Sequence, residues 1–367
     1  MYKNIRSLLF KLDPEQAHNL TLDLLDRTRF LPGSQWLLRK IFKAPPNPVE
    51  AFGLTFPNPV GLAAGYDKHA DAVRPLSTLG FGHIEVGTVT PLLQTGNPKP
   101  RVFRLAEDQA IINSMGFPSR GATRVVKALK KLGYCQYPHQ KTKRVINLRR
   151  FFPESRRKRK DKNMILGVNI GKNKHTPNKE AVLDYLSLLE LFAPCADYLT
   201  INISSPNTIG LRDLQGRDAL EALLIQLDKQ RVMEEKKLNK KLPLLVKLSP
   251  DLSDEELDDA LDVILATGMD GIVATNTTIS RNADLASAQR TAEGGLSGSP
   301  LKSTSEAVLT KILKRVDGAL PVISSGGVMT PDDVKKRLEM GAALVQVYTG
   351  LIYYGPALVK DAVNALD

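Results

Sequence analysis

Short continuous apolar runs alternate with amphipathic helical patterns from about residue 50 to the end of the chain. Continuous apolar runs, rather than alternating ones, are typical of parallel strands that are buried on both faces. Eight strand–helix units over roughly 310 residues predict a (β/α)8 TIM barrel, and a doubly wound sheet with about six strands fits less well. The predicted strands are Val60–Ala64, His83–Val89, Leu166–Ile170, Tyr198–Ile203, Leu244–Leu248, Gly271–Thr275, Val322–Ser325 and Leu344–Tyr348.

Residues 1–45 follow a different pattern, which predicts a small N-terminal helical hairpin ahead of a barrel over residues 46–367. Asp13, Pro14 and Glu15 form a helix start, with an N-cap, a proline at the first helical position and an acid in the first turn. Two helices are expected, with apolar faces made by Ala17, Leu20, Leu24 and Leu25 and by Trp36, Leu37, Ile41 and Phe42. On these residues alone, a hairpin packed on the barrel is favoured over a surface-lying membrane anchor.

Composition places the chain among soluble globular proteins, with 42% hydrophobic and 25% charged residues. No apolar run reaches the roughly 18 residues that a transmembrane helix needs. The N-terminus lacks the features of a secretory signal peptide, so export by that route is not expected. Cys135 and Cys195 are far apart in sequence and lack metal-ligand spacing, which indicates a reduced intracellular compartment and no metal site.

The formal net charge of +12 is concentrated in one segment. Residues 141–163 contain 11 Lys or Arg against 2 acids, so the rest of the chain carries only about +3. A basic protein that binds nucleic acid would carry its charge on the binding face. The local distribution therefore argues against a nucleic-acid binder, and interleaved aromatic residues are sparse as well.

Polar or glycine-containing turns follow all eight predicted strands. In a TIM barrel the loops after the strands form the active face, so eight polar strand ends predict a site there. Glycine-rich turns after the last two strands, together with Gly294–Gly298, predict that the ligand carries a phosphate group. The turns are 65–68, 87–90, 169–172, 202–208, 247–249, 275–278, 326–327 and 348–350.

Nine motifs in these turns, in order along the chain, resemble dihydroorotate dehydrogenase of the membrane-associated, quinone-using class 2. They are Gly61–Lys68, Gly87–Pro91, Gly96–Leu105, Asn113–Phe117, Asn169–Asn173, Asn202–Thr208, Ala274–Thr278, Gly294–Gly298 and Gln346–Gly350. Each motif is weak alone, but nine in register are specific, and the resemblance covers residues 1–367.

The resemblance implies oxidation of (S)-dihydroorotate to orotate in de novo pyrimidine (UMP) biosynthesis. It implies one FMN per chain as hydride acceptor and a membrane quinone, ubiquinone or menaquinone, as final electron acceptor. It also implies a monomer bound peripherally to the cytoplasmic side of a bacterial inner membrane. The N-terminal hairpin then becomes a membrane-associating segment that forms the mouth of a quinone tunnel.

The resemblance also carries residue roles. The catalytic base falls on Ser205 with Thr208 as its helper, whereas soluble relatives carry a cysteine at the base position. Substrate contacts fall on Lys68, Asn113, Ser114, Met115, Gly116, Phe117, Asn202, Asn207, Asn276 and Thr277. Cofactor contacts fall on Ala64, Gly65, Tyr66, Asp67, Lys68, Thr88, Asn169, Asn202, Lys247, Thr275, Gly298, Gly327, Tyr348 and Thr349, and quinone contacts on His18, Arg104 and Tyr348.

One segment departs from the family pattern, because about 28 extra residues lie within 135–163. A disordered, solvated charge run is the favoured interpretation, and a basic amphipathic element for anionic lipid is the alternative. A rival enzyme, a flavin barrel that reduces uridine in tRNA, would require a cysteine acid in the active loop and basic residues at the barrel mouth. Neither is present.

Overall fold

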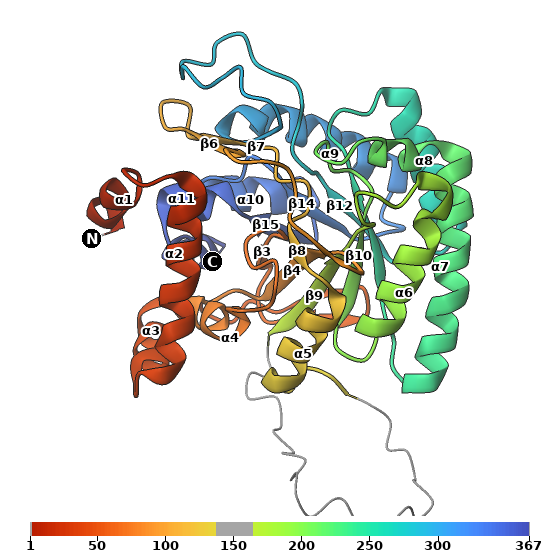
Figure 1. The fold of residues 1–367 in the computed structure, drawn as a ribbon, viewed down its shortest axis with the longest axis horizontal. Helices are drawn as coiled ribbons and strands as arrows, with labels where there is room; N and C mark the ends of the chain where they lie inside the picture. The colour runs from red at the N-terminus through yellow and green to blue at the C-terminus, as the bar shows by residue number, and fades with distance from the viewer. Residues whose placement is uncertain (1, 137–163, 367) are drawn as a thin grey trace, which may run out of the picture.

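Eight parallel strands close into a barrel in the order β10–β11–β12–β14–β15–β3–β4–β9 (Figure 1). The structure, a computed structural model, describes residues 2–136 and 164–366. The strands are β3 (Val60–Leu62), β4 (His83–Val89), β9 (Ile165–Ile170), β10 (Tyr198–Asn202), β11 (Leu244–Leu248), β12 (Gly271–Ala274), β14 (Val322–Ser325) and β15 (Leu344–Val347). Every one coincides with a predicted apolar run, so the predicted TIM barrel is confirmed.

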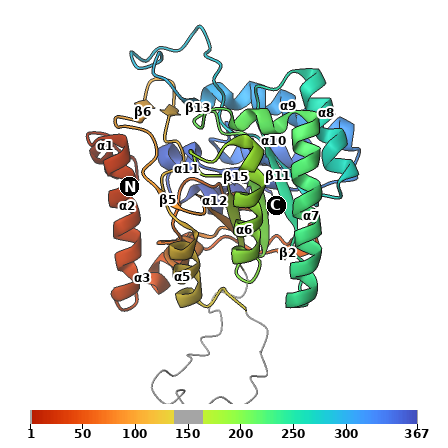
Figure 2. The same ribbon diagram turned by 45° about the vertical axis from the view of Figure 1, so that its right-hand side comes forward.

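Helices surround the barrel, and α6, α7 and α8 stand side by side along one flank (Figure 2). Two of the helices begin with capping boxes, which satisfy backbone N–H groups of the first turn. Ser253 and Glu256 form the box of α8, and Thr330 and Asp333 form the box of α10. The helices are α4 (Val73–Leu76), α5 (Ala122–Leu132), α6 (Ala181–Phe192), α7 (Arg217–Leu238), α8 (Asp254–Ala266), α9 (Lys302–Val316), α10 (Pro331–Glu339), α11 (Thr349–Tyr354) and α12 (Leu358–Asn364). Short 3-10 turns are η2 (Ser77–Leu79), η3 (Asn178–Glu180), η4 (Leu211–Gln215) and η5 (Ser299–Leu301).

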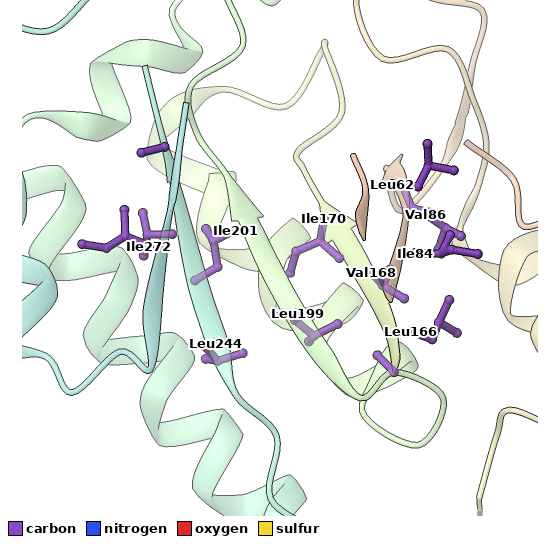
Figure 3. Packing of buried hydrophobic residues seen from close by; sticks show 14 of the residues in the cluster. Leu62, Ile84, Val86, Leu166, Val168, Ile170, Leu199, Ile201, Leu244 and Ile272 are labelled. Atoms are coloured by element: carbon purple, nitrogen blue, oxygen red, sulfur yellow. The ribbon is translucent and has the colours of Figure 1, made fainter. Parts of the chain in front are cut away.

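The main core lies between the strands and the helices (Figure 3). Aliphatic side chains of neighbouring strands, such as Leu62, Ile84 and Leu199, are fully buried there. A second layer, at the end of the barrel where the strands begin, combines Phe56 and Tyr198 with aliphatic side chains such as Leu245. The hairpin β1 (Val49–Ala51) and β2 (Leu54–Phe56) supplies part of this layer, so it closes that end of the barrel.

Short antiparallel strands add to the loops after the barrel strands. β6 (Val102–Leu105), β7 (Ala110–Asn113) and β13 (Gly295–Gly298) form one sheet, and β5 (Leu93–Gln94) pairs with β8 (Ser119–Arg120). None was predicted, because strands of two to four residues leave little periodicity to detect. Their hydrogen bonds hold β7, which ends at Asn113, between β6 and β13.

The N-terminal segment contains α1 (Tyr2–Leu9), α2 (Pro14–Arg27), η1 (Thr28–Phe30) and α3 (Ser34–Phe42). The two predicted helices are present as α2 and α3, and the Asp13 carboxylate caps α2 by accepting from two backbone N–H groups at 3.0 Å. α1 was missed because it has no capping signal and is fixed by distant contacts, such as the hydrogen bond that the Tyr2 hydroxyl donates to the Ile352 carbonyl at 2.7 Å. Among the described residues, no helix has both the length and the apolar character to cross a bilayer.

A buried ion pair connects α2 to the barrel loops. The Glu15 carboxylate accepts from Arg101 Nη2 at 2.8 Å and from Nε at 3.2 Å, a two-point contact that matches the guanidinium fork. Arg101 also donates from Nη1 to the carbonyls of Thr95 and Asn97, at 2.7 and 2.9 Å. Both charged residues are less than a tenth exposed. The helix therefore neutralises a cation that shapes the loop before β6.

The expectation of two separate reduced thiols is wrong for this structure. Cys135 and Cys195 form a disulfide across 60 residues of sequence, with their Cα atoms 3.8 Å apart. The pairing follows from the fold, because the segment after α5 and the turn between α6 and β10 meet at the same end of the barrel. Sequence distance alone could not reveal this contact.

Residues 137–163 lie outside the described residues, so both interpretations of the basic segment remain predictions.

We expect Glu15→Gln to lower the free energy of unfolding by about 3 kcal/mol, because a neutral amide leaves the Arg101 cation buried without its counter-charge. Urea unfolding monitored by circular dichroism measures this change. Asp259→Asn is the matched control, since it removes an exposed ion pair with Arg217 and should leave the free energy of unfolding nearly unchanged. Equal stabilities for the two variants would contradict the importance of the buried pair.

Candidate active site

A cavity of about 460 Å³ lies where the loops after the barrel strands meet the N-terminal helices. Its wall brings together most of the residues that the sequence predicted for the site. They are Lys68, Asn113, Met115, Gly116, Phe117, Asn202, Ser205, Asn207, Asn276 and Thr277, then Ala64, Gly65, Tyr66, Thr88, Lys247, Thr275, Gly298, Gly327, Tyr348 and Thr349, and also His18 and Arg104.

Four predicted residues do not line this cavity: Ser114, Asp67, Asn169 and Thr208. The Asp67 carboxylate accepts from the backbone N–H groups of Asp71 and Ala72 at 2.9 and 2.8 Å, so it is used to shape its own turn. Burial raises the pKa of this carboxyl to about 6. Asn169 lies behind the wall, and its contacts are with other side chains of the barrel interior.

Lys68 is the cation of the cavity wall. It follows β3, and its Nζ donates to the Gly65 carbonyl at 2.5 Å. Burial lowers the pKa of Lys68 to about 8, while the nearby Glu15 carboxylate opposes this decrease. The ammonium group is therefore still largely protonated at neutral pH and can attract an anion inside the cavity.

Amide side chains from three loops meet on one side of the cavity. Asn207 Nδ2 donates to Asn113 Oδ1 at 3.2 Å, which joins the loop after β10 to the end of β7. Asn276 Nδ2 donates to the Ser204 hydroxyl at 3.0 Å. Amides offer both donors and acceptors, so this wall suits a planar ring with alternating polar groups. Ser204, assigned on sequence only to completing the turn, thus also holds a cavity amide in place.

The Ser205 hydroxyl is 5% exposed and accepts from the backbone N–H of Asn207 at 3.3 Å. It lines the cavity, so its oxygen can reach a bound molecule. Thr208, three residues later, has a buried hydroxyl with no hydrogen-bond partner among the described residues. A hydroxyl in such a dry environment has a free lone pair and a free proton for exchange with a neighbour.

Glycines form a close-approach cradle at another part of the cavity. Gly298, Gly326 and Gly327 have φ values of 97°, 98° and 71°, in the left-handed region. A Cβ at Gly327 would lie 2.4 Å from the Lys302 Cα, so only glycine fits there. Nearby, the Ser297 and Thr349 hydroxyls are hydrogen-bonded at 2.9 Å. Exposed backbone and hydroxyl groups of this kind suit a phosphate group.

Arg337 supports this cradle from behind and was not found from the sequence. It is fully buried, and its Nη2 donates to the Gly326 and Lys302 carbonyls, both at 3.2 Å. A third bond from Nη2 reaches the Ser305 hydroxyl at 2.8 Å. An arginine within an ordinary helical pattern gives no sign in the sequence that it is buried.

The N-terminal helices close the remaining side of the cavity with aromatic residues. The His18 ring meets the Tyr66 ring edge-on with centroids 5.1 Å apart, and Tyr66 meets Tyr348 at 5.8 Å. Burial, with a smaller effect of Lys68, lowers the pKa of His18 to about 3, so its imidazole is neutral. Arg104 packs over the Phe10 ring at 4.2 Å and donates to the Phe10 carbonyl at 3.1 Å. The three residues predicted for the quinone thus line the same cavity.

A polar centre inside the barrel lies next to this wall, and its main member, Glu85, was missed. Glu85 is fully buried in the middle of β4. The only sequence signal was a carboxylate in a continuous apolar run, which is rare unless the charge has partners. Gln346 on β15 also lines the cavity and donates to Glu85 at 2.9 Å.

Comparisons with known proteins identify the family of the chain. The family model for dihydroorotate dehydrogenase matches residues 48–367. The chain is 45% identical over 369 aligned residues to "Dihydroorotate dehydrogenase (quinone)" of Marinomonas sp. (strain MWYL1), covering 100% of this chain and 97% of that protein. It is 47% identical to the protein of the same name from Dichelobacter nodosus (strain VCS1703A), covering 99% and 97% of the two chains.

A solved structure shares the fold as well. The ligand-free DHODH of Eimeria tenella superposes with a TM-score of 0.79 at 40% identity, over 96% of this chain and 94% of that one. The family in general implies a flavin-type cofactor. The full-length identity, the matching fold and the cavity residues lead to one conclusion: the chain belongs to the dihydroorotate dehydrogenase family.

Proposed function

We propose that the chain oxidises (S)-dihydroorotate to orotate, with FMN as hydride acceptor and a membrane quinone as final electron acceptor, in de novo pyrimidine biosynthesis. One observation carries the proposal. A single cavity combines the Ser205 hydroxyl, the Lys68 cation and a wall of amides with a glycine cradle and an aromatic entrance. The names of the relatives agree with this reaction.

The cavity residues fit FMN, with one molecule per chain. The cradle at Gly298 and Gly327 suits its phosphate, because it exposes backbone where a side chain would not fit. Lys247 is a buried cation on the cavity wall, and Glu85 offsets part of the effect of burial on it. Its positive charge would balance negative charge on a bound flavin ring. Further proposed contacts include Thr88, near the end of β4, and Thr275, directly after β12. The chemistry supplied by a bound flavin would be acceptance of a hydride.

On the substrate side, Lys68 holds the carboxylate and the amides of Asn113, Asn207 and Asn276 hold the pyrimidine ring. Ser205 would remove the proton from C5 when the hydride of C6 is transferred to a bound flavin, which leaves a C5–C6 double bond. A serine hydroxyl is a weak base, so it needs a dry site and a group that accepts its own proton onward. The buried, unpartnered Thr208 hydroxyl is the candidate for this second role.

The N-terminal segment, residues 1–45, is proposed to rest on the membrane and deliver quinone to His18, Arg104 and Tyr348. Its helices expose apolar side chains, for example Leu8, Phe30 and Trp36, which are 65%, 70% and 66% exposed. Amphipathic helices with such faces bind at the lipid–water interface without spanning it. We propose peripheral binding by a monomer at the cytoplasmic side of the inner membrane. The remaining exposed apolar residues of this segment are Ile5, Leu12, Leu20, Leu24, Leu31, Leu37 and Ile41.

Purified protein is expected to be yellow from bound FMN, and its absorption near 450 nm (an approximate flavin value) should bleach when dihydroorotate is added without oxygen. Addition of a short-chain quinone should restore the colour. Colourless protein that binds no added FMN, or colour that dihydroorotate leaves unchanged, would refute the proposed function.

Ser205→Ala should lower the rate of flavin reduction by dihydroorotate by about 10²- to 10⁴-fold, the usual range for loss of a general base. Orotate affinity should stay within about threefold, because the substituted hydroxyl contributes little to binding. Stopped-flow absorbance and calorimetric titration measure the two quantities. Normal flavin reduction in this variant would show that another group removes the proton.

Orotate affinity should decrease as pH rises above about 8, because Lys68 must be protonated to pair with the carboxylate. The folded-state pKa lies below the ordinary value of about 10.5, so the cation is lost from pH 8 upward and kept below it. The dissociation constant should then rise towards tenfold per pH unit. Calorimetric titration between about pH 6.5 and 9 checks this, and Lys68→Met should bind weakly without this pH dependence. A constant affinity for the native protein would contradict the assigned role.

A further inference from the structure

Glu85 is the acceptor at the centre of the barrel interior. A carboxylate has no donor, so each group that touches it must turn an N–H or O–H towards it. Four side chains from three other strands do so. The donors are Asn169 Nδ2 at 2.8 Å, Gln346 Nε2 at 2.9 Å, the Tyr198 hydroxyl at 3.0 Å and the Thr200 hydroxyl at 3.1 Å.

This contact fixes which way the Asn169 amide faces. Its nitrogen is used by Glu85, so its oxygen points to the other side, where it accepts from the Thr88 hydroxyl at 2.6 Å. The same oxygen accepts from Asn202 Nδ2 at 3.0 Å. If Asn169 were turned over, two nitrogen donors would face each other, and an oxygen would face the carboxylate.

The orientation passes on to the cavity wall. Because Asn202 uses its nitrogen on Asn169, its oxygen is available to accept from Asn276 Nδ2 at 3.3 Å. Asn276 then keeps its own oxygen for the backbone N–H of Thr277 at 2.8 Å. Three amides in series thus share one direction, and the last two line the cavity.

The Glu85 carboxylate also orients Gln346, which lies on β15. Its nitrogen donates to Glu85, while its oxygen is buried and has no partner within the described ranges 2–136 and 164–366. Gln346 lines the cavity and is 1% exposed. A buried acceptor without a donor costs free energy unless a ligand supplies one.

We propose that Glu85 is a positioning residue that sets the direction of the amides Asn169, Asn202, Asn276 and Gln346, and so fixes which donors and acceptors meet the bound pyrimidine and flavin. The proposal rests on the function proposed above. The alternative is that Glu85 only neutralises the buried Lys247. That role would need one nearby negative charge but no set of directed hydrogen bonds.

Glu85→Gln tests the proposal, because glutamine keeps the shape but has one acceptor end and one donor end. It cannot accept from Asn169 and Gln346 together, so at least one of these amides must reverse. Orotate affinity of the flavin-loaded protein should fall at least about tenfold, which is the effect of losing about one or two buried hydrogen bonds. The ligand-free protein should also be less stable to urea.

The double variant Glu85→Gln with Asn169→Asp should restore both properties. The new glutamine nitrogen can donate to the carboxylate at 169, whose other oxygen still accepts from Thr88 and Asn202. The glutamine oxygen keeps the other three donors, so every amide retains its direction. Recovery to within about threefold of native orotate affinity is expected, whereas a second substitution in a merely structural site would only add to the damage.

Tyr198→Phe is the matched control. It removes one donor to Glu85 but leaves the carboxylate and all four amides in place, so orotate affinity should stay within about twofold. The proposal is overturned if Glu85→Gln binds orotate like the native protein, or if the double variant regains stability without regaining affinity. Failure of the native protein to bind orotate would instead refute the proposed function. In that case the urea stabilities of the three variants would still test whether Glu85 orients the amides through its hydrogen bonds.

Discussion

Closure of the parallel barrel is the constraint on which the rest of the structure depends. Because all eight strands run in one direction around a closed ring, every strand delivers its last residues to the same rim. Polar side chains that are more than a hundred residues apart, such as Thr88 and Asn202, therefore come within hydrogen-bond distance. The short antiparallel strands and N-terminal helices only complete a cavity whose position the ring has already determined.

Several charged side chains are buried in or near the rim of the barrel. Each of them has hydrogen-bond partners or a counter-charge close by. Glu85 lies inside the ring with four donors, Arg337 lies behind the glycine cradle with carbonyl and hydroxyl acceptors, and Arg101 is matched by Glu15. Buried charges are weak contributors to stability when paired but costly when left alone. Their placement beside the cavity indicates that they hold shape and charge at the site, while the aliphatic layer outside the barrel supplies most of the hydrophobic stabilisation.

The barrel could be predicted from the sequence because its strands are continuous apolar runs that differ from everything around them. Cavity residues such as Lys68 and Asn202 could be predicted because they lie at the ends of those runs. Others, such as Asn113 and His18, could be predicted only because their motifs match a known family in order. What escaped prediction depends on contacts between distant segments. The Cys135–Cys195 disulfide and the helix that begins at Tyr2 follow from three-dimensional neighbours, and no local periodicity or motif predicts them. Glu85 is marked in the sequence only as a carboxylate within an apolar run, and its four donors come from other strands.

The contact between Glu15 and Arg101 bears on how this chain can be divided. Residues 1–45 precede the barrel in the chain and expose many apolar side chains, so a shortened chain would be an obvious aid to crystallisation. Yet Arg101 also holds the carbonyl of Asn97, and Asn97 Nδ2 donates to the Asn207 carbonyl at 3.2 Å, in the loop that carries Ser205. Removing or exchanging residues 1–45 therefore takes the counter-ion of Arg101 away from the barrel loops. A replacement segment would need to carry a carboxylate in the first turn of its second helix.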